Sequence, residues 1–263
     1  HPSVYEFLEF PVKNAADLRR VIDEHYQVEP MEARSGPDRE KKISAAEKED
    51  VITVVDGGCY YWTLRSLSGV EVASYLLYDA PDLVEELFER YLTVVVAGIR
   101  ETSRRVRVDC IGFGEDIAYK AGPLISPAMF RRLILPRYRK AMETAAGCGI
   151  QLSWYDSDGD LKPLLEDMLR VGINTVAPCE VAAGMSPGEL RRRWGKQIRI
   201  IGGIDKREVA SGPAAIDREI ERNRPLIEEG GFIPAIDHSV SADISFQNYC
   251  YFIRQLEKVL AGV

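Results

Sequence analysis

Acidic residues follow short apolar runs at two places in the middle of the chain. Residues 106–116 read V-R-V-D-C-I-G-F-G-E-D, and residues 150–160 read I-Q-L-S-W-Y-D-S-D-G-D. An apolar run of this length that carries β-branched residues and precedes a helical pattern is typical of a buried strand in a βα unit. Charged groups at the carboxyl end of such a strand are costly unless they lie at the mouth of a sheet or barrel, where ligands bind. The sequence therefore predicts a functional site at these strand ends.

Glu115 and Asp116 are adjacent, so in an extended strand their side chains point to opposite faces. One of them can face a barrel axis, while the other caps a helix or pairs with a lysine. If Asp116 lies in a crowded acidic mouth with Asp156, Asp158 and Asp205, like-charge repulsion and desolvation should raise its pKa. The alternative is that an acid only caps the loop that follows it. This explanation fits each of these acids taken singly, but it is a poor explanation for all of them together.

The pair Asp237-His238 follows another apolar run, and His238 is one of three histidines in the chain. A histidine at a strand end can act as an acid, a base or a ligand near neutral pH. The alternative is a histidine that is held by Asp237 or by a loop carbonyl. A position at the mouth of a barrel favours the chemical role.

Strand-like and helix-like segments alternate with a spacing that requires a parallel sheet. Each of six predicted strands ends in a polar cluster, which fits a barrel mouth better than the single switch point of an open sheet. The N-terminal part contributes a helix capped by Asn14 and an exposed connection over 30–50, and Asp79 is the predicted cap of the helix over 82–104. The predicted strands are 51–55, 106–113, 150–155, 174–178, 198–201 and 232–236, and the predicted helices are 62–77, 82–104, 126–146, 161–170, 187–194, 213–228 and 245–260.

The composition is that of a globular protein with a large core. With 263 residues, 46% of them hydrophobic, the chain can form one α/β barrel or two smaller domains. The net charge of −7 comes from 34 basic and 41 acidic residues that are well mixed, so we expect no nucleic-acid or membrane partner. Five cysteines without CxxC pairing indicate reduced thiols in a cytoplasmic protein.

Three further features give weaker signals. Residues 157–160, Ser-Asp-Gly-Asp, resemble a cation-binding loop but lack the rest of an EF-hand, so a tight turn at Gly159 and a helix N-cap at Asp160 are the better interpretation. Residues 202–205, Gly-Gly-Ile-Asp, resemble a phosphate-binding turn without the rest of a nucleotide motif. Cys179 has no sequence neighbour that would activate it, and we interpret it as structural.

An ordered set of motifs makes the chain resemble the uroporphyrinogen decarboxylase superfamily. The motifs are G-E-D-I-A-Y-K-A-G-P-L-I-S-P, S-D-G-D, E-V-A-A-G-M, G-G-I-D-K and G-G-F-I-P-A-I-D-H-S-V. The resemblance runs from about Phe10 to the C-terminus and is strongest to the branch of methyl-cobamide methyltransferases and their uncharacterised relatives. It implies an α/β fold, a (β/α)8 TIM barrel, with the site in a cleft at the carboxyl ends of the strands.

The resemblance also implies a single domain over residues 1–263 that lacks part of the family fold. The first two barrel strands of the family would precede Phe10, and with them an Arg-rich loop and an Asp that bind the substrate in the decarboxylases. The chain begins at His1-Pro2 without a methionine. We therefore expect that an N-terminal part precedes these residues.

Carried over residue by residue, the resemblance assigns roles at the predicted site. His238 falls on a cleft histidine of the decarboxylases, Asp205 on the Asp of a Gly-Asn-Leu-Asp-Pro turn, and Asp116 on a cleft Ser. We predict these three as catalytic, with His238 and Asp116 handling protons and Asp205 orienting the substrate. The predicted binding residues are Glu115, Tyr119, Asp156, Asp158, Glu180 and Asp237.

The zinc-dependent methyltransferases of the superfamily hold their metal with a His-x-Cys and a further Cys. This chain has Tyr155-Asp156-Ser157 and a position near His238 instead, so we expect no thiolate zinc site. If a metal binds, oxygen and imidazole ligands would come from Asp156, Asp158, Glu180 or His238. The organic cofactor that the resemblance suggests is a corrinoid.

The resemblance leaves three functions open. The first is corrinoid-linked methyl transfer on a small-molecule substrate, with a corrinoid protein as candidate partner and a homodimer as candidate assembly. The second is decarboxylation of a porphyrinogen or a smaller carboxylate, which would need cleft cations such as Arg65, Lys120, Lys206 and Arg207. The third is a corrinoid- or tetrapyrrole-binding protein without catalysis. Methyl transfer is our first choice.

Overall fold

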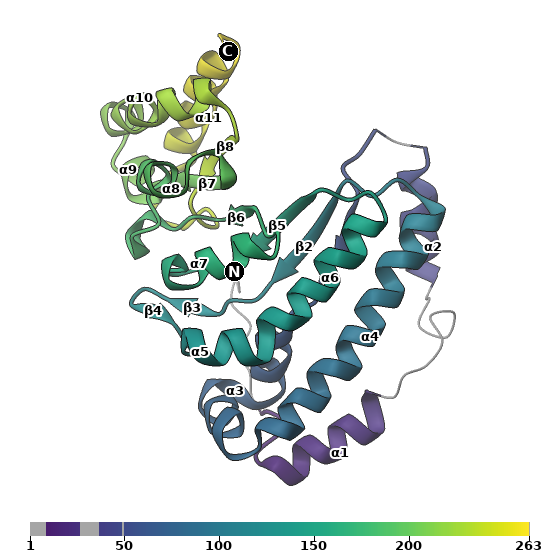
Figure 1. The fold of residues 1–263 in the computed structure, drawn as a ribbon. Helices are drawn as coiled ribbons and strands as arrows, with labels where there is room; N and C mark the ends of the chain where they lie inside the picture. The colour runs from purple at the N-terminus through teal and green to yellow at the C-terminus, as the bar shows by residue number, and fades with distance from the viewer. Residues whose placement is uncertain (1–8, 27–36, 49, 263) are drawn as a thin grey trace. The chain divides into compact units, whose positions relative to one another are not determined.

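The computed structural model describes residues 9–26, 37–48 and 50–262. The chain divides into two compact units, the first from residues 1–115 and 128–151 and the second from residues 116–127 and 152–263. Both units combine parallel strands with helices (Figure 1). The predicted α/β class with parallel strands is therefore confirmed. The expectation of one domain over residues 1–263 stays a prediction.

The first unit contains two parallel strands, β1 (Val54–Asp56) and β2 (Cys110–Gly114), with Val55 opposite Ile111. Both strands were predicted, but both begin later than the expected residues 51 and 106. Helices α4 and α6 run side by side in this unit (Figure 1). The helical segments are α1 (Ala15–His25), α2 (Pro37–Ala46), α3 (Tyr60–Asp79), α4 (Pro81–Arg105), the π-helix η2 (Phe130–Ile134) and α6 (Leu135–Gly147), and a short α5 (Pro127–Met129) precedes η2.

Hydrogen bonds from side chains explain where two of these helices begin. The side chain of Asn14 accepts a hydrogen bond from the amide of Asp17 at 3.0 Å, which confirms the predicted cap of α1. Helix α3 is capped from far along the chain, because Glu115 accepts from the amides of Tyr60 at 2.6 Å and Trp62 at 2.8 Å. These amides lack hydrogen-bond partners inside the helix, and the carboxyl oxygens of Glu115 provide them.

The core of the first unit is aromatic. The ring of Tyr138 lies 5.7 Å from that of Tyr60, 4.8 Å from that of Phe113 and 5.9 Å from that of Phe130, measured between centroids. The rings meet at steep angles, an arrangement that the charge distribution of aromatic rings favours. All four side chains are buried. This packing holds the start of α3 next to the end of β2, where Glu115 reaches its amides.

Two helices of the first unit differ from the prediction. Residues 37–46 form α2, where one short helical turn was expected in an exposed connection; residues 30–36 and 49 of that connection lie outside the described residues. This segment has no long apolar period, but it contains several residues with high helix propensity and buries the side chain of Ile43, and these features explain why a helix forms. Asp79 does not cap the next helix, because it is the last residue of α3. Helix α4 begins at Pro81, whose missing amide needs no cap.

The second unit is built on four parallel strands in the order β5-β6-β7-β8. The sequence predicted all four, but not the short helix after β7 or the hairpin of β3 and β4, whose segments are too short to show a period. The strands are β3 (Ala118–Tyr119), β4 (Gly122–Pro123), β5 (Leu152–Asp156), β6 (Thr175–Ala177), β7 (Arg199–Ile204) and β8 (Phe232–Ile236). The helices are α7 (Lys162–Arg170), α8 (Pro187–Trp194), α9 (Lys206–Ala210), α10 (Pro213–Glu229) and α11 (Phe246–Leu260), with short 3-10 turns at Val181–Ala183 and Gly195–Gln197.

Glycines allow close backbone approach at the strand ends of the second unit. Gly202 has a φ of 98°, and a Cβ atom there would lie 1.9 Å from the carbonyl oxygen of Pro178. The amide of Gly203 donates to that same oxygen at 3.0 Å, so this turn uses its amide for packing rather than for a phosphate. Gly159 has a φ of 82° and lies against the backbone of the β3–β4 hairpin, which confirms the predicted tight turn.

Among the described residues, no helix is both long enough and apolar enough to cross a membrane.

Candidate functional site

The strand ends of the second unit carry polar side chains. Asp156 is the last residue of β5, and Glu180, Lys206 and His238 follow β6, β7 and β8. Because these strands are parallel and adjacent, their carboxyl ends lie at the same edge of the sheet. That edge is where ligands bind in parallel α/β proteins.

His238 and Asp158 form the central contact at this edge. The Nε2 atom of His238 lies 3.1 Å from Oδ2 of Asp158. The histidine side chain is 36% exposed and the aspartate side chain 42% exposed, so a ligand can reach both. The partner of the imidazole is thus Asp158 and not the neighbouring Asp237. An imidazole next to a carboxylate can hold or release a proton near neutral pH.

Partial burial and, to a smaller extent, like charges raise the pKa values of two carboxylates here. Partial burial is the largest cause of the raised pKa of Asp156, and the charges of Asp116 and Asp158 add to it. Burial also raises the pKa of Asp158; the charge of His238 lowers it in part, and Asp116 and Glu180 raise it further. The sequence prediction assigned this effect to Asp116, whose charge in the structure instead contributes to the raised pKa values of Asp156 and Asp158. Five predicted residues are thus near enough to interact, and we call them the acidic–histidine cluster: Asp116, Asp156, Asp158, Glu180 and His238.

The hairpin of β3 and β4 holds the segment that carries Asp116. Asp116 has a φ of +44°, a left-handed conformation that side chains other than glycine rarely adopt. The amide of the next residue, Ile117, donates to Oγ of Ser157 at 3.0 Å. The carbonyl of Tyr119 accepts from the amide of Asp160 at 3.0 Å. Two hydrogen bonds therefore tie this segment to the loop after β5, and they hold Asp116 in its unusual conformation.

Glu180 connects the cluster to a cation. Its Oε1 atom lies 3.4 Å from Nζ of Lys206, and its Oε2 atom accepts from the amide of Gly159 at 3.4 Å. Asp237 has no exposed surface and accepts from the amides of Val181 at 2.8 Å and Lys206 at 3.0 Å. Burial raises the pKa of Asp237, and these two amides offset the rise in part. We interpret Asp237 as a positioning residue, although the sequence pointed to a binding role.

Asp205 does not join the cluster. Its side chain caps α9 by accepting from the amide of Arg207 at 2.9 Å, and the guanidinium of Arg207 lies 2.6 Å from its Oδ2 atom. Burial by itself would raise the pKa of Asp205, but the hydrogen bonds and charge of Arg207 outweigh it, so the pKa lies below its ordinary value. The residue is 5% exposed. With both oxygens bound to Arg207, Asp205 holds the start of α9 and with it Lys206.

Two other predicted binding residues have different surroundings. Glu115 belongs to the first unit, is 1% exposed, and accepts from the hydroxyl of Tyr138 at 2.5 Å besides capping α3. Burial raises the pKa of Glu115 to about 7, although these hydrogen bonds oppose the rise. Tyr119 in β3 is 69% exposed, so its hydroxyl is free to meet a ligand.

The described residues do not form a metal site. No group of three or more His, Cys, Asp or Glu side chains within the described part of the chain is arranged to hold a metal ion. Asp156, Asp158, Glu180 and His238 therefore do not fit as a ligand set. Cys179 is buried, and burial raises the pKa of its thiol. Its Sγ atom lies 3.6 Å from the carbonyl of Val176, in keeping with the structural interpretation.

Two further residues organise this site, and the sequence did not predict the role that either one has in the structure. Oγ of Ser157 accepts a hydrogen bond from the amide of Ile117 and so connects the loop after β5 to the segment before β3. Lys206 was counted as a cation for a substrate carboxylate, but its ammonium group is next to Glu180. The G-G-I-D-K motif contained a signal for Lys206, because a lysine after the fifth predicted strand lies beside strands that also end in acids.

Comparisons with known proteins agree with this fold. The sequence model of the family described as uroporphyrinogen decarboxylase (URO-D) matches residues 59–259. A solved structure described as a methyltransferase from Methanosarcina mazei is similar over 95% of this chain and 70% of that chain, with 16% sequence identity and a TM-score of 0.66. No curated protein matches the sequence. Because the family match covers most of the chain, this protein belongs to the URO-D family.

Proposed function

We propose that the acidic–histidine cluster is the reaction centre of an enzyme that transfers a methyl group from a small substrate to a corrinoid. The observation that carries the proposal is the 3.1 Å contact between His238 and Asp158, with both side chains partly exposed at the carboxyl ends of parallel strands. Membership of the URO-D family and the fold similarity to a methyltransferase support it.

The cluster supplies proton transfer to the atom that loses the methyl group. When the bond between that atom and the methyl carbon breaks, the electron pair stays on the atom, which then needs a proton. His238 can deliver this proton, and Asp158 orients the imidazole and stabilises its charged form.

The charge of the cluster limits the substrate. It has four acidic residues and one imidazole, and Lys206 offsets one of the acids. Such a site favours a methyl donor that is neutral or positively charged over one that carries several carboxylates. A small alcohol, ether, thioether or amine with a methyl group has the appropriate charge.

In this proposal the corrinoid is a second substrate, held by a partner protein. When present, it would accept the methyl group. The described residues include no feature that is specific for a corrinoid. The residues of this chain bind the methyl donor and manage its proton.

Decarboxylation of a porphyrinogen is the second candidate, because the family model is named for that reaction. Such a substrate needs cations that are available for its carboxylates. In the second unit, the ammonium group of Lys206 is next to Glu180, and the guanidinium of Arg207 is bound to Asp205. These pairings favour the methyl donor. A non-catalytic corrinoid- or tetrapyrrole-binding protein is the third candidate.

The test uses the purified chain with reduced cobalamin and a panel of small methyl donors. The absorbance of cobalamin reports its methylation, and turnover in a donor-dependent manner is the expected result. A parallel reaction with uroporphyrinogen is analysed for loss of carboxyl groups. Decarboxylation without methyl transfer would favour the second candidate. Absorbance changes that show binding of cobalamin or coproporphyrin without turnover would favour the third.

A further inference from the structure

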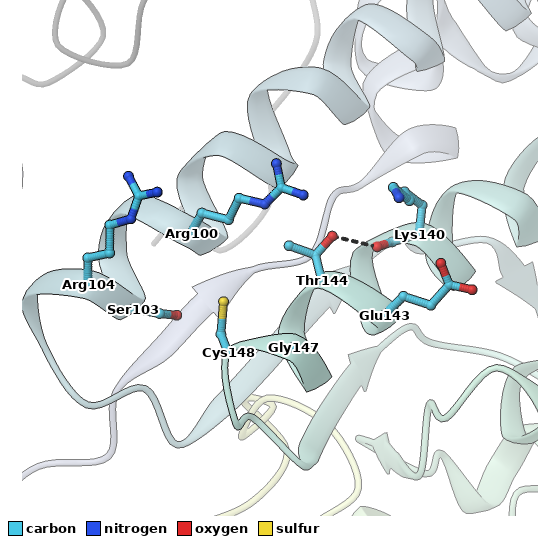
Figure 2. Close-up of a pocket in the computed structure, with 8 residues that line it drawn as sticks. All are labelled: Arg100, Ser103, Arg104, Lys140, Glu143, Thr144, Gly147 and Cys148. Carbon is cyan, nitrogen blue, oxygen red and sulfur yellow. Dashed lines mark hydrogen bonds between the residues drawn. The ribbon is translucent and has the colours of Figure 1, made fainter.

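A cavity of about 480 Å³ lies in the first unit, on helices α4 and α6. Figure 2 shows its walls: α4 provides Arg100, Ser103 and Arg104, and α6 provides side chains opposite them. The volume falls in the range of small-molecule sites. We call it the cationic cavity, and its lining residues are Arg100, Ser103, Arg104, Lys140, Glu143, Thr144, Gly147 and Cys148.

The cavity carries an excess of positive charge. Three of its lining residues are cations and one, Glu143, is an acid, which leaves a formal charge of +2 (three minus one). Within residues 9–26, 37–48 and 50–262, none of these three cations forms an ion pair of 4.0 Å or less. By contrast, the neighbouring Arg105 binds Glu40 at 2.7 Å, and Arg137 of α6 binds Glu89 at 2.6 Å. Arg105 and Arg137 are thus neutralised by acids, whereas the three cations of the cavity are not, within the described residues.

Compensation of helix dipoles does not explain all three cations. A basic residue in the last turn of a helix offsets the partial negative charge there, and Arg104 in the last turn of α4 has this role. Arg100 lies one turn earlier. Lys140 lies in the first half of α6, far from its end at Gly147. Arg100 and Arg104 are also four residues apart on one helix, a spacing at which like charges repel. An anion between them would remove this repulsion.

The hydroxyl groups of the cavity point to a ligand that accepts hydrogen bonds. Oγ of Ser103 is buried and has no hydrogen-bond partner in the described part of the chain. Ser103 is one of the residues that line the cavity. Thr144 is different, because its hydroxyl already donates to the carbonyl of Lys140 at 2.8 Å (Figure 2). An unpartnered buried hydroxyl is costly, so a ligand that accepts from it would stabilise the site.

We propose that the cationic cavity binds the phosphate group of a small phosphorylated molecule. A phosphate dianion matches the charge of +2. The guanidinium groups of Arg100 and Arg104 offer paired N–H donors with the spacing of phosphate oxygens, and Lys140 adds a compact charge. The volume exceeds that of one phosphate group, so an organic part of the ligand also fits. This site is independent of the reaction proposed for the second unit.

The test measures binding to the intact chain by isothermal titration calorimetry at constant ionic strength. The probes are inorganic phosphate, glycerol phosphate and, as a dianion without phosphorus, succinate. We expect saturable binding of the two phosphates and weaker binding of succinate. Tighter binding of glycerol phosphate than of inorganic phosphate identifies an ester as the ligand, and the reverse order identifies free phosphate. Equal binding of succinate, or no saturable binding of either phosphate, would overturn the proposal.

Substitutions inside and outside the cavity distinguish phosphate binding in the cavity from attraction to the overall charge of the protein. Arg100→Gln and Lys140→Gln are each expected to weaken phosphate binding about tenfold, because each removes one charged hydrogen bond. The matched control is Arg139→Gln, which removes the same charge from α6 at an exposed residue that does not line the cavity. It should leave the affinity unchanged. An equal loss in all three variants would mean that phosphate senses only the overall charge, and the proposal would be wrong.

Cys148 provides a second readout in the unmodified protein. Its thiol is exposed at the cavity wall (Figure 2). A bound phosphate should slow its alkylation by iodoacetamide, as followed by peptide mass spectrometry. Alkylation of Cys250 on α11 serves as the internal control and should not change. Binding by calorimetry without protection of Cys148 would place the phosphate elsewhere and contradict the proposal.

Discussion

Glu115 and Asp158 show two ways in which this protein keeps a carboxyl group whose pKa is raised. Glu115 in the first unit is almost fully buried, and its oxygens accept hydrogen bonds from two backbone amides and from Tyr138. Asp158 in the second unit is 42% exposed and contacts one imidazole. Burial is the largest cause at both residues, but like charges contribute at Asp158. A raised pKa alone therefore does not identify a reactive group.

The comparison separates a structural carboxyl group from a candidate catalytic one. Glu115 joins the start of α3 to the end of β2, and a substrate cannot reach it. Asp158 has few fixed partners, so its protonation can change without loss of the fold. We therefore expect substitutions in the acidic–histidine cluster to reduce activity and substitutions at Glu115 to reduce stability.

The largest expected effect is on catalysis. His238→Gln and Asp158→Asn should each lower the rate of methyl transfer by about 100-fold or more, because each disrupts the pair that delivers a proton. Their free energies of unfolding should change by less than about 1 kcal/mol, since both side chains are partly exposed. The rate is measured with reduced cobalamin as acceptor. Glu228→Gln, at an exposed residue of α10, is the control, and an equally slow control would refute the assignment.

The next largest effect is on the pH dependence of stability. Glu115 has a pKa of about 7 in the folded chain and an ordinary value of 4.5, so it stabilises the fold most below pH 4.5 and loses this contribution as the pH rises through 7. At 1.36 kcal/mol per pH unit, the loss amounts to about 3 kcal/mol. Urea unfolding between pH 4.5 and pH 8 should show this decline relative to Glu115→Gln. Parallel pH curves for the two proteins would count against the raised pKa.

A smaller loss is expected from Glu115→Gln itself. At pH 5 the free energy of unfolding of the variant should be about 2 kcal/mol below that of the unmodified chain. The amides of Tyr60 and Trp62 donate to the two oxygens of the carboxyl group, and the NH2 group that replaces one of these oxygens in glutamine cannot accept a hydrogen bond. Urea unfolding gives this difference. Glu257→Gln, at an exposed residue of α11, should change the free energy by less than about 0.5 kcal/mol. Equal changes in the free energy of unfolding for both variants would show that the cap of α3 does not stabilise the fold.

The smallest effect concerns the tuning of the cluster. Asp116→Asn removes a negative charge that raises the pKa values of Asp156 and Asp158, so both pKa values should fall. The acidic limb of the pH–rate profile for methyl transfer should then move to lower pH, by less than about one pH unit. A shift to higher pH would mean that these carboxyl groups do not control the rate.

Most elements of the fold could be predicted because each follows from a local pattern. Strand β8 was found with the predicted ends, and α10 and α11 within one or two residues, since apolar periods and glycine stops mark them. Helix α9 and the β3–β4 hairpin are too short to carry a period. The cap of α3 could not be predicted, because Glu115 lies more than fifty residues from the amides that it binds.

The structure brings some of the predicted site residues together and leaves others apart. Asp156, Asp158, Glu180 and His238 were predicted because each lies at or just after the carboxyl end of a strand. They lie at one edge of the sheet, because parallel neighbouring strands align their carboxyl ends. Asp205 and Asp237 were predicted from the same position after a strand, but the oxygens of Asp205 bind the guanidinium of Arg207 and those of Asp237 bind backbone amides. Both kinds of acid look alike in the sequence.

By itself, the sequence determined the parallel α/β fold, the family and the positions of acids and histidine at the strand ends, because these depend on residue type and on periods within a few turns of chain. The tertiary structure decided which carboxyl groups stay accessible. That choice depends on whether an amide or a guanidinium lies within about 3 Å, as at Glu115 and Asp205, or whether an imidazole and other carboxylates do, as at Asp158. Such neighbours come from distant segments, and packing alone brings them together.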